Sequence, residues 1–163
     1  MAVVDEVRAA NDEYASGFSK GDLPIPPGRK LAVVACMDAR LDPARALGLE
    51  EGDAHVIRNA GGRAADALRS LVISQQLLGT NEVIVLHHTD CGMLSFDNAT
   101  LQGICQERLG VDAADMDFLP FGDLEQSVRD DVALIRSSPV IPDDITVSGF
   151  IYDVKTGRIH EVA

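Results

Sequence analysis

Hydrophobic residues along the chain fall into short continuous runs that alternate with longer segments of helical spacing. The runs Leu31–Ala35 and Glu82–Leu86 are almost wholly apolar, which is typical of parallel strands covered on both faces. Between them, Ala54–Ile57 predicts another strand, and Ala64–Leu78 predicts a helix that ends at Gly79. This alternation predicts an α/β fold with a mostly parallel central sheet flanked by helices.

The two ends of the chain have different patterns. Val3–Phe18 places apolar residues at helical spacing in a charged segment, so it predicts an amphipathic helix. The Pro-rich segment Pro24–Gly28 separates this helix from the body. Two further helices are expected, at Phe96–Leu109 and Leu124–Ser137. A C-terminal pair of strands is expected at Ile145–Tyr152 and Arg158–Val162, joined by a hairpin turn at 155–157. We therefore expect a single domain over residues 1–163, in which residues 1–28 form a helical arm and connector.

Composition narrows the classes of partner. The chain has 163 residues, 46% of them hydrophobic, and a formal net charge of −12. This acidity argues against binding to nucleic acid or to anionic membrane surfaces. No apolar run approaches the roughly 20 residues of a membrane span, and Met1–Tyr14 lacks a secretory pattern. A cytoplasmic protein is the expectation.

Candidate chemistry lies where the predicted strands end. Cys36 follows the first apolar run, and His88 and Cys91 follow the run at 82–86. Two Cys and one His are zinc ligands, and three protein ligands with one open position are typical of catalytic zinc. Because ligands bind beyond the carboxyl ends of parallel strands, the three side chains converge if these two strands are neighbours.

Other readings of the cysteines remain open. Each motif alone is compatible with a buried cysteine or a hydrogen-bonded core histidine. Cys105, the third cysteine, stands in a helical stretch, so a cage of four cysteines is impossible. A Cys36–Cys91 disulfide is the other alternative, although an odd cysteine count favours a reducing compartment.

Polar residues and glycines near these ligands suggest further roles. Asp38 can accept a hydrogen bond from water at the metal, or it can coordinate the metal as a fourth ligand in a closed state. Arg40 can hold that carboxylate through two parallel hydrogen bonds and so keep the metal open. Gly61 and Gly62 precede a helix and are candidate substrate-binding residues for an anion, with turn geometry as the alternative. Arg58 is expected to form a structural ion pair.

The segments ACMDAR, IRNAGG and HHTDCG, in this order and at these separations, resemble the β-class carbonic anhydrases over about Leu31–Val162. The resemblance implies Zn²⁺ and a catalytic Asp–Arg dyad. It also implies hydration of carbon dioxide to bicarbonate by a zinc-bound hydroxide. A homodimer or homotetramer, with the N-terminal helix laid across a partner subunit, is implied as well. The residues that match the family motifs are Cys36, His88 and Cys91 as zinc ligands, and Asp38 with Arg40 as the dyad. His87 is then not a ligand but a strand-end residue packed or bonded beside the ligands.

Departures from the family pattern leave the substrate open. The chain has no Trp, it is short, and Gly62 stands where many members of the family carry Asn. These features resemble a compact subgroup that also contains hydrolases of carbonyl sulfide and, rarely, of carbon disulfide. The shape of the pocket, set by apolar side chains near Met37, Leu41, Met93 and Leu94 or by a partner subunit, is expected to discriminate between substrates, with core packing as their alternative role. A non-catalytic zinc-binding regulatory protein is the alternative from another class, although it has no use for Asp38 and Arg40.

Overall fold

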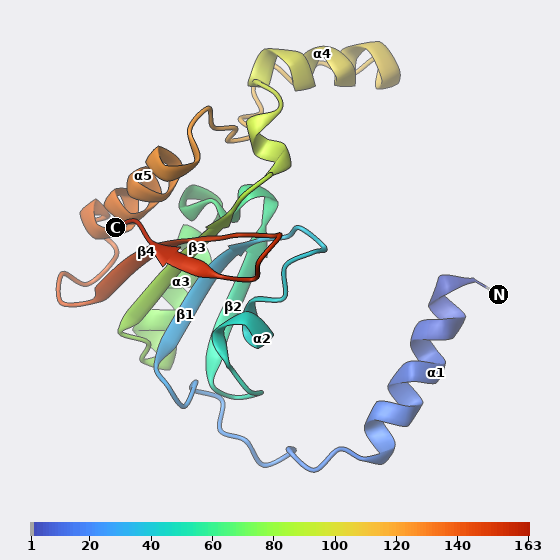
Figure 1. Cartoon of the computed structure of the whole chain (residues 1–163), viewed down its shortest axis with the longest axis vertical. Coiled ribbons are helices and arrows are strands. Elements are labelled where there is room, and N and C mark those ends of the chain that lie inside the picture. The colour runs from blue at the N-terminus through green and yellow to red at the C-terminus, as the bar shows by residue number, and fades with distance from the viewer. Residues whose placement is uncertain (1) are drawn as a thin grey trace.

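A five-stranded sheet forms the centre of the computed structural model, which describes residues 2–163 (Figure 1). The strand order is β2-β1-β3-β4-β5, and only β5 runs antiparallel to its neighbour. The strands are β1 Leu31–Cys36, β2 Ala54–Asn59, β3 Glu82–His88, β4 Thr146–Tyr152 and β5 Ile159–Glu161. The predicted α/β class with a mostly parallel sheet and a C-terminal strand pair is confirmed.

Helices and loops cover the two faces of the sheet in different ways. The helices are α1 Val3–Ser16, α2 Pro43–Leu47, α3 Ala64–Leu78, α4 Asn98–Leu109 and α5 Leu124–Ser137. Helices α3 and α5 pack on one face, where Leu71 and Val128 join Val34 and Val85 of the strands in one apolar cluster. The other face is covered by the segments that follow β1 and β3. Both segments begin at the carboxyl edge of the sheet, where the candidate ligands lie.

Two helices stand away from the sheet, α1 at the end of a long connector and α4 beyond the carboxyl edge (Figure 1). Neither helix has a buried residue. The base of α1 is tied to the turn before β2, because the Tyr14 hydroxyl donates to Glu51 at 2.8 Å and Lys20 pairs with Glu50 at 3.2 Å and with Glu51. Within residues 2–163, no helix is both long enough and apolar enough to cross a membrane.

The predicted elements agree with the structure except near their ends. Strands β2 and β3 each run two residues further than their apolar runs, so the second ends at His88. Helix α4 begins two residues later than predicted, because Asp97 caps it by accepting the Thr100 N–H. The short helix α2 was not predicted, since five residues after Asp42 are too few to show a helical period.

Candidate metal centre

The position of His88 follows from the alternation of side chains along β3. Successive residues of a strand point to opposite faces, so His87 faces α5 and His88 faces the side of the candidate cysteines. His88 is fully buried, and its Nδ1–H donates to the Thr89 carbonyl at 2.9 Å. Its Nε2 therefore carries a lone pair, yet that buried atom has no hydrogen-bond partner among residues 2–163. A metal ion would satisfy it.

The two cysteines complete a group of three donors. Cys36 is the last residue of β1, which pairs directly with β3, and Cys91 lies in the turn after β3. The sulfur and nitrogen donor atoms of Cys36, His88 and Cys91 all lie within 4.8 Å of one another, and all three residues are buried. Two thiolates and an imidazole are the donors that zinc prefers. This donor set, with its unpartnered imidazole nitrogen, fits zinc.

The three donor side chains differ in the direction of their pKa shifts. The hydrogen bond from Cys91, together with the neighbouring His88 imidazole and the backbone of Asp38 and Gly61, outweighs burial and lowers the pKa of Cys36 to about 4. The same contact with Cys36, reinforced by burial, raises the pKa of the Cys91 thiol. Burial lowers the pKa of His88, but contacts with Cys36, Thr89 and Asp38 outweigh it, so the net shift is upward. These contacts favour the thiolate of Cys36, and a metal bound by the group would displace the proton of Cys91.

Arg40 holds Asp38 beside the three donors. Its Nε and Nη2 donate to the two carboxylate oxygens at 3.0 and 2.8 Å, and its backbone N–H donates at 2.8 Å. The guanidinium also binds the Asp90 side chain at 2.7 Å and its carbonyl at 2.9 Å. These bonds from Arg40 hold the pKa of Asp38 well below its usual range. Asp38 Oδ2 lies 3.8 Å from His88 Nε2, so an ionised carboxylate faces the site.

A cavity of about 370 Å³ opens beside the donors. Its walls are mostly apolar and come from three loops, and its lining residues are Cys36, Met37, Asp38, Ala60, Gly61, Cys91, Gly92, Met93, Ser95 and Phe96. Met37 and Met93 lie where the sequence placed them, whereas Leu41 belongs to the core and Leu94 lines a neighbouring hollow. Such a cavity suits a small neutral molecule.

The two glycines of the glycine-rich turn after β2, Gly61 and Gly62, have different surroundings. Gly61 and Gly62 have φ of 79° and 66°, a region that favours glycine. Both are buried, but Gly61 lines the cavity, whereas a Cβ at Gly62 would lie 2.8 Å from the Cys36 backbone nitrogen. The Ala64 N–H at the start of α3 is bound by the buried Asp131 carboxylate at 3.1 Å. The helix start is therefore occupied by the chain's own carboxylate, and of the two glycines only Gly61 is among the residues that line the cavity.

The structure changes the role expected for Arg58. No carboxylate pairs with Arg58 among the described residues, so the predicted ion pair was wrong. Instead, its guanidinium donates to the carbonyls of Cys36 at 3.0 Å, Asp38 at 2.8 Å and Leu41 at 2.9 Å. Arg58 thus holds the loop that carries the candidate ligand Cys36 and the Asp38–Arg40 pair.

Sequence reasoning missed the groups behind the site. His87 is buried and bonded, as expected, but its partners Ser127 and Asp131 lie on α5, about 40 residues away. No spacing in the sequence links them to β3. The alternation of side chains along a strand could have predicted such a partner. It places His87 and His88 on opposite faces of the sheet, and a buried His87 then needs a polar partner from the helices that cover its face.

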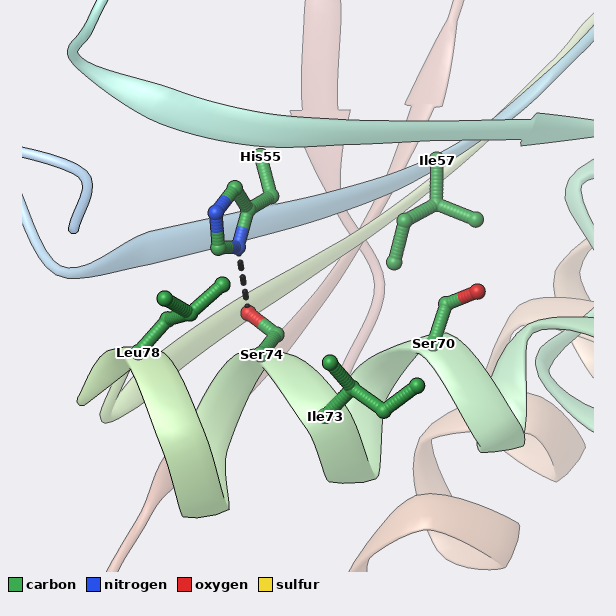
Figure 2. Close-up of a pocket in the computed structure, with 6 residues that line it drawn as sticks. All are labelled: His55, Ile57, Ser70, Ile73, Ser74 and Leu78. Carbon is green, nitrogen blue, oxygen red and sulfur yellow. Dashed lines mark hydrogen bonds between the residues drawn. The ribbon is translucent and has the colours of Figure 1, made fainter. Parts of the chain in front are cut away.

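A second hollow, of about 200 Å³, lies between β2 and α3 (Figure 2). There the His55 ring is hydrogen-bonded to Ser74 Oγ at 2.7 Å, above Ile73 and Leu78 of the helix. His55 is thus a residue of β2, and none of the predicted site residues lines this hollow.

Known proteins resemble this chain over nearly its whole length. The family model described as "Carbonic anhydrase" matches residues 31–119. β-Carbonic anhydrase 1 of Mycobacterium tuberculosis is 47% identical over 165 residues, covering 99% of each chain. A carbon disulfide hydrolase of Acidithiobacillus thiooxidans is 36% identical over 156 residues, covering 83% of this chain and 78% of that protein. The crystal structure of a carbonic anhydrase from Streptococcus mutans has 54% identity and a TM-score of 0.95, covering 100% of this chain and 99% of that one.

Proposed function

Because the chain belongs to the β-carbonic anhydrase family, we propose that it catalyses the zinc-dependent, reversible hydration of carbon dioxide to bicarbonate. The observation that carries the proposal is the buried Cys36–His88–Cys91 donor set with a carboxylate held beside it. Cys36, His88 and Cys91 would hold the zinc ion. Zinc bound there would lower the pKa of a water molecule from ~15.7 toward ~7 and so supply a hydroxide nucleophile near neutral pH.

The chain's own residues orient the reactants. Asp38 is an ionised hydrogen-bond acceptor that faces the donors, so it would hold the nucleophilic water in one orientation through Oδ2. Arg40 and Asp90 keep this carboxylate in place, because the guanidinium binds both of them. The apolar walls formed by Met37, Met93 and other residues would admit a small neutral linear molecule and exclude excess water.

A second substrate is favoured by a specific observation. A relative that is 36% identical is named a carbon disulfide hydrolase, and the cavity beside the donors is apolar. Carbonyl sulfide and carbon disulfide are linear and neutral like carbon dioxide, so the same residues would serve a hydrolase. A non-catalytic zinc protein is disfavoured, since it has no use for a carboxylate held ionised beside an open metal position.

Assembly and location are part of the proposal. A homodimer or homotetramer is supported by the apolar residues Val3, Val7 and Tyr14 of α1 and by Phe18 just beyond it, which are exposed in the single chain. A cytoplasmic location is supported by Cys36 and Cys91, because these free thiols must stay reduced to bind a metal. Fractionation of the source cells with an antibody against the chain tests the location.

The proposed activity is tested by turnover of the zinc-loaded protein with carbon dioxide and carbonyl sulfide, at pH about 7 and about 9. Cys91→Ala removes one ligand, and Cys105→Ala is the matched control on exposed α4. Fast hydration of carbon dioxide that only Cys91→Ala abolishes supports the carbonic anhydrase. Preference for carbonyl sulfide would support the hydrolase instead. Absence of turnover with both substrates would support a non-catalytic zinc protein.

A further inference from the structure

His87 lies buried on the face of β3 opposite the proposed zinc ligands, beneath α5. Its Nδ1 is 2.8 Å from Ser127 Oγ, and its Nε2 is 3.1 Å from Asp131 Oδ2 and 3.2 Å from the Gly62 carbonyl. Because Nε2 faces two acceptor oxygens, it carries a ring proton and donates to them, while Nδ1 is hydrogen-bonded to the Ser127 hydroxyl. The imidazole thus joins β3, α5 and the glycine-rich turn.

Asp131 extends this connection to the start of α3. It is 1% exposed, and its Oδ2 accepts the Ala64 N–H at 3.1 Å while Oδ1 forms an ion pair with Arg63 at 3.1 Å. The Arg63 guanidinium lies 5.2 Å from the centre of the Phe121 ring, which in turn stacks on His87 at 5.5 Å. Buried carboxylates cost stability unless they are paired and bonded, and here both oxygens have a cationic or N–H partner.

The far side of the glycine-rich turn reaches the first ligand. Gly62 packs so closely on Cys36 that a Cβ atom would lie 2.8 Å from the Cys36 nitrogen and 2.9 Å from the Ala35 carbonyl carbon. Any group that fixes the Gly62 carbonyl therefore also fixes the turn that packs on the backbone of Cys36.

We propose that His87 and Asp131 are positioning residues of the site: through the Gly62 carbonyl and the start of α3 they hold the glycine-rich turn against the backbone of Cys36. The inference rests on the proposed zinc site and goes beyond it, because neither residue touches metal or substrate. Hydrogen bonds around metal ligands fix their orientation, and losing one typically costs about 10- to 100-fold in metal affinity or activity. The competing explanation is that the network only caps α3 and fills the core.

The experiment compares zinc affinity and the cobalt(II) absorption spectrum of the full-length protein and its variants. His87→Phe keeps the ring and its stacking on Phe121 but removes both ring-nitrogen bonds, and Asp131→Asn removes the buried charge. Ser127→Ala removes one histidine partner. Ser74→Ala is its matched control, because Ser74 is an equally buried helix serine bonded to a strand histidine, His55, in the hollow away from the donors (Figure 2).

We expect zinc affinity, measured by competition with a chromophoric chelator, to fall about tenfold in His87→Phe and in Asp131→Asn. We also expect the thiolate-to-cobalt charge-transfer band to shift in both variants. Ser127→Ala should move both readouts in the same direction by a smaller amount. Ser74→Ala should leave the zinc affinity and the cobalt spectrum unchanged, even if it lowers the unfolding temperature.

Unchanged affinity and spectra in folded His87→Phe and Ser127→Ala would overturn the inference and leave the network a structural one. If Asp131→Asn does not fold, those two variants still decide. Turnover is measured in parallel, so the two proposals fail separately. A wild-type protein that turns over neither substrate, but whose variants lose zinc affinity, removes the proposed activity and retains the positioning role.

Discussion

Arg40 binds the Asp38 carboxylate at both oxygens, and this geometry decides what the carboxylate does. Asp38 Oδ2 is only 3.8 Å from the unpartnered nitrogen of His88, a short reach from any metal there. In Arg40→Ala we therefore expect Asp38 to turn toward the metal as a fourth ligand. Turnover should fall at least about 100-fold while zinc stays bound, since a preorganised electrostatic contact of this kind is worth about that much.

Zinc content and X-ray absorption check this expectation, because a fourth protein oxygen changes the metal's ligand shell. Arg40→Lys is the informative companion: it keeps the charge but lacks the two-pronged geometry, so it should fall between wild type and Arg40→Ala. Near-normal turnover by Arg40→Ala, with the ligand shell unchanged, would show that Arg40 does not control Asp38.

Gly62 provides a second test at the scale of one residue. Gly62→Ala adds a Cβ against the Cys36 backbone at a φ of 66°, so strain and overlap fall on the first ligand. We expect a loss of roughly 2–4 kcal/mol in the free energy of unfolding, together with weaker zinc binding. Gly79→Ala is the control, because Gly79 has a φ of 73° but no atom within 4 Å of the added Cβ. Urea unfolding of the two variants should differ, and equal losses with equal zinc affinity would remove the close-contact argument.

Individual residues show why the sequence predicted the donors better than their surroundings. Cys36, His88 and Cys91 stand at the ends of apolar runs, and parallel strands bring such ends together. Arg58 was misassigned because its partners are backbone carbonyls, which carry no residue identity. The Asp131 carboxylate lay beyond prediction for another reason: helix packing alone brings it to β3 and α3.

At the scale of elements, helix α5 packs closely against β4 at Gly149. A Cβ atom at Gly149 would overlap the side chains of Val128 and Val132. We expect Gly149→Ala to lower the free energy of unfolding by about 1–3 kcal/mol through overpacking. Gly103→Ala, in exposed α4 with open space around it, should instead raise it by up to about 1 kcal/mol. Thermal unfolding measures both, and a neutral Gly149→Ala would mean that α5 can shift without cost.

The connection between α1 and the body gives a prediction for pH. Hydrogen bonds from Lys20 and Tyr14 lower the pKa of Glu51 below its ordinary value. A carboxyl with a lowered folded-state pKa stabilises the folded arrangement fully above its ordinary pKa, and this contribution is lost as the pH falls through the lower value. We expect NMR order parameters of residues 17–23 to be higher at pH 6 than below pH 4.

Glu51→Gln should already reduce this order at pH 6, by the roughly two- to fivefold change in population that exposed ion pairs produce. Glu13→Gln, on the exposed helix and without a side-chain partner among the described residues, is the control. Equal order in all three proteins at both pH values would show that the contacts at Glu51 do not hold the arm.

Periodicity predicted the long elements and missed the short ones for a physical reason. Helices α3 and α5 contain four turns or so of regular spacing, and their predicted bounds match the structure. The short helix α2 and the turn at 60–62 depend on a cap and on positive φ rather than on spacing. The extension of β3 to His88 was hidden because polar residues at a strand end resemble a loop in the sequence.

At the scale of the whole molecule, two features oppose each other. The formal net charge of −12 makes copies of the chain repel one another, whereas α1 presents an apolar stripe that the single chain leaves exposed. A 14-residue helix is marginal in water unless a surface covers its apolar side. The stripe therefore favours self-association, and added salt should strengthen it by screening the repulsion.

We expect the double variant Val3→Glu, Val7→Glu to weaken self-association at least about 100-fold, since burying each valine contributes about 1.5 kcal/mol or more. Sedimentation velocity at several concentrations measures it, and Asp12→Lys on the opposite side of α1 is the control. Cys36, His88 and Cys91 all belong to one chain, so the double variant should still bind one zinc per chain. If it binds zinc but stays as associated as wild type, the contact between copies lies elsewhere, and the edge of the sheet at β2 becomes the next surface to test.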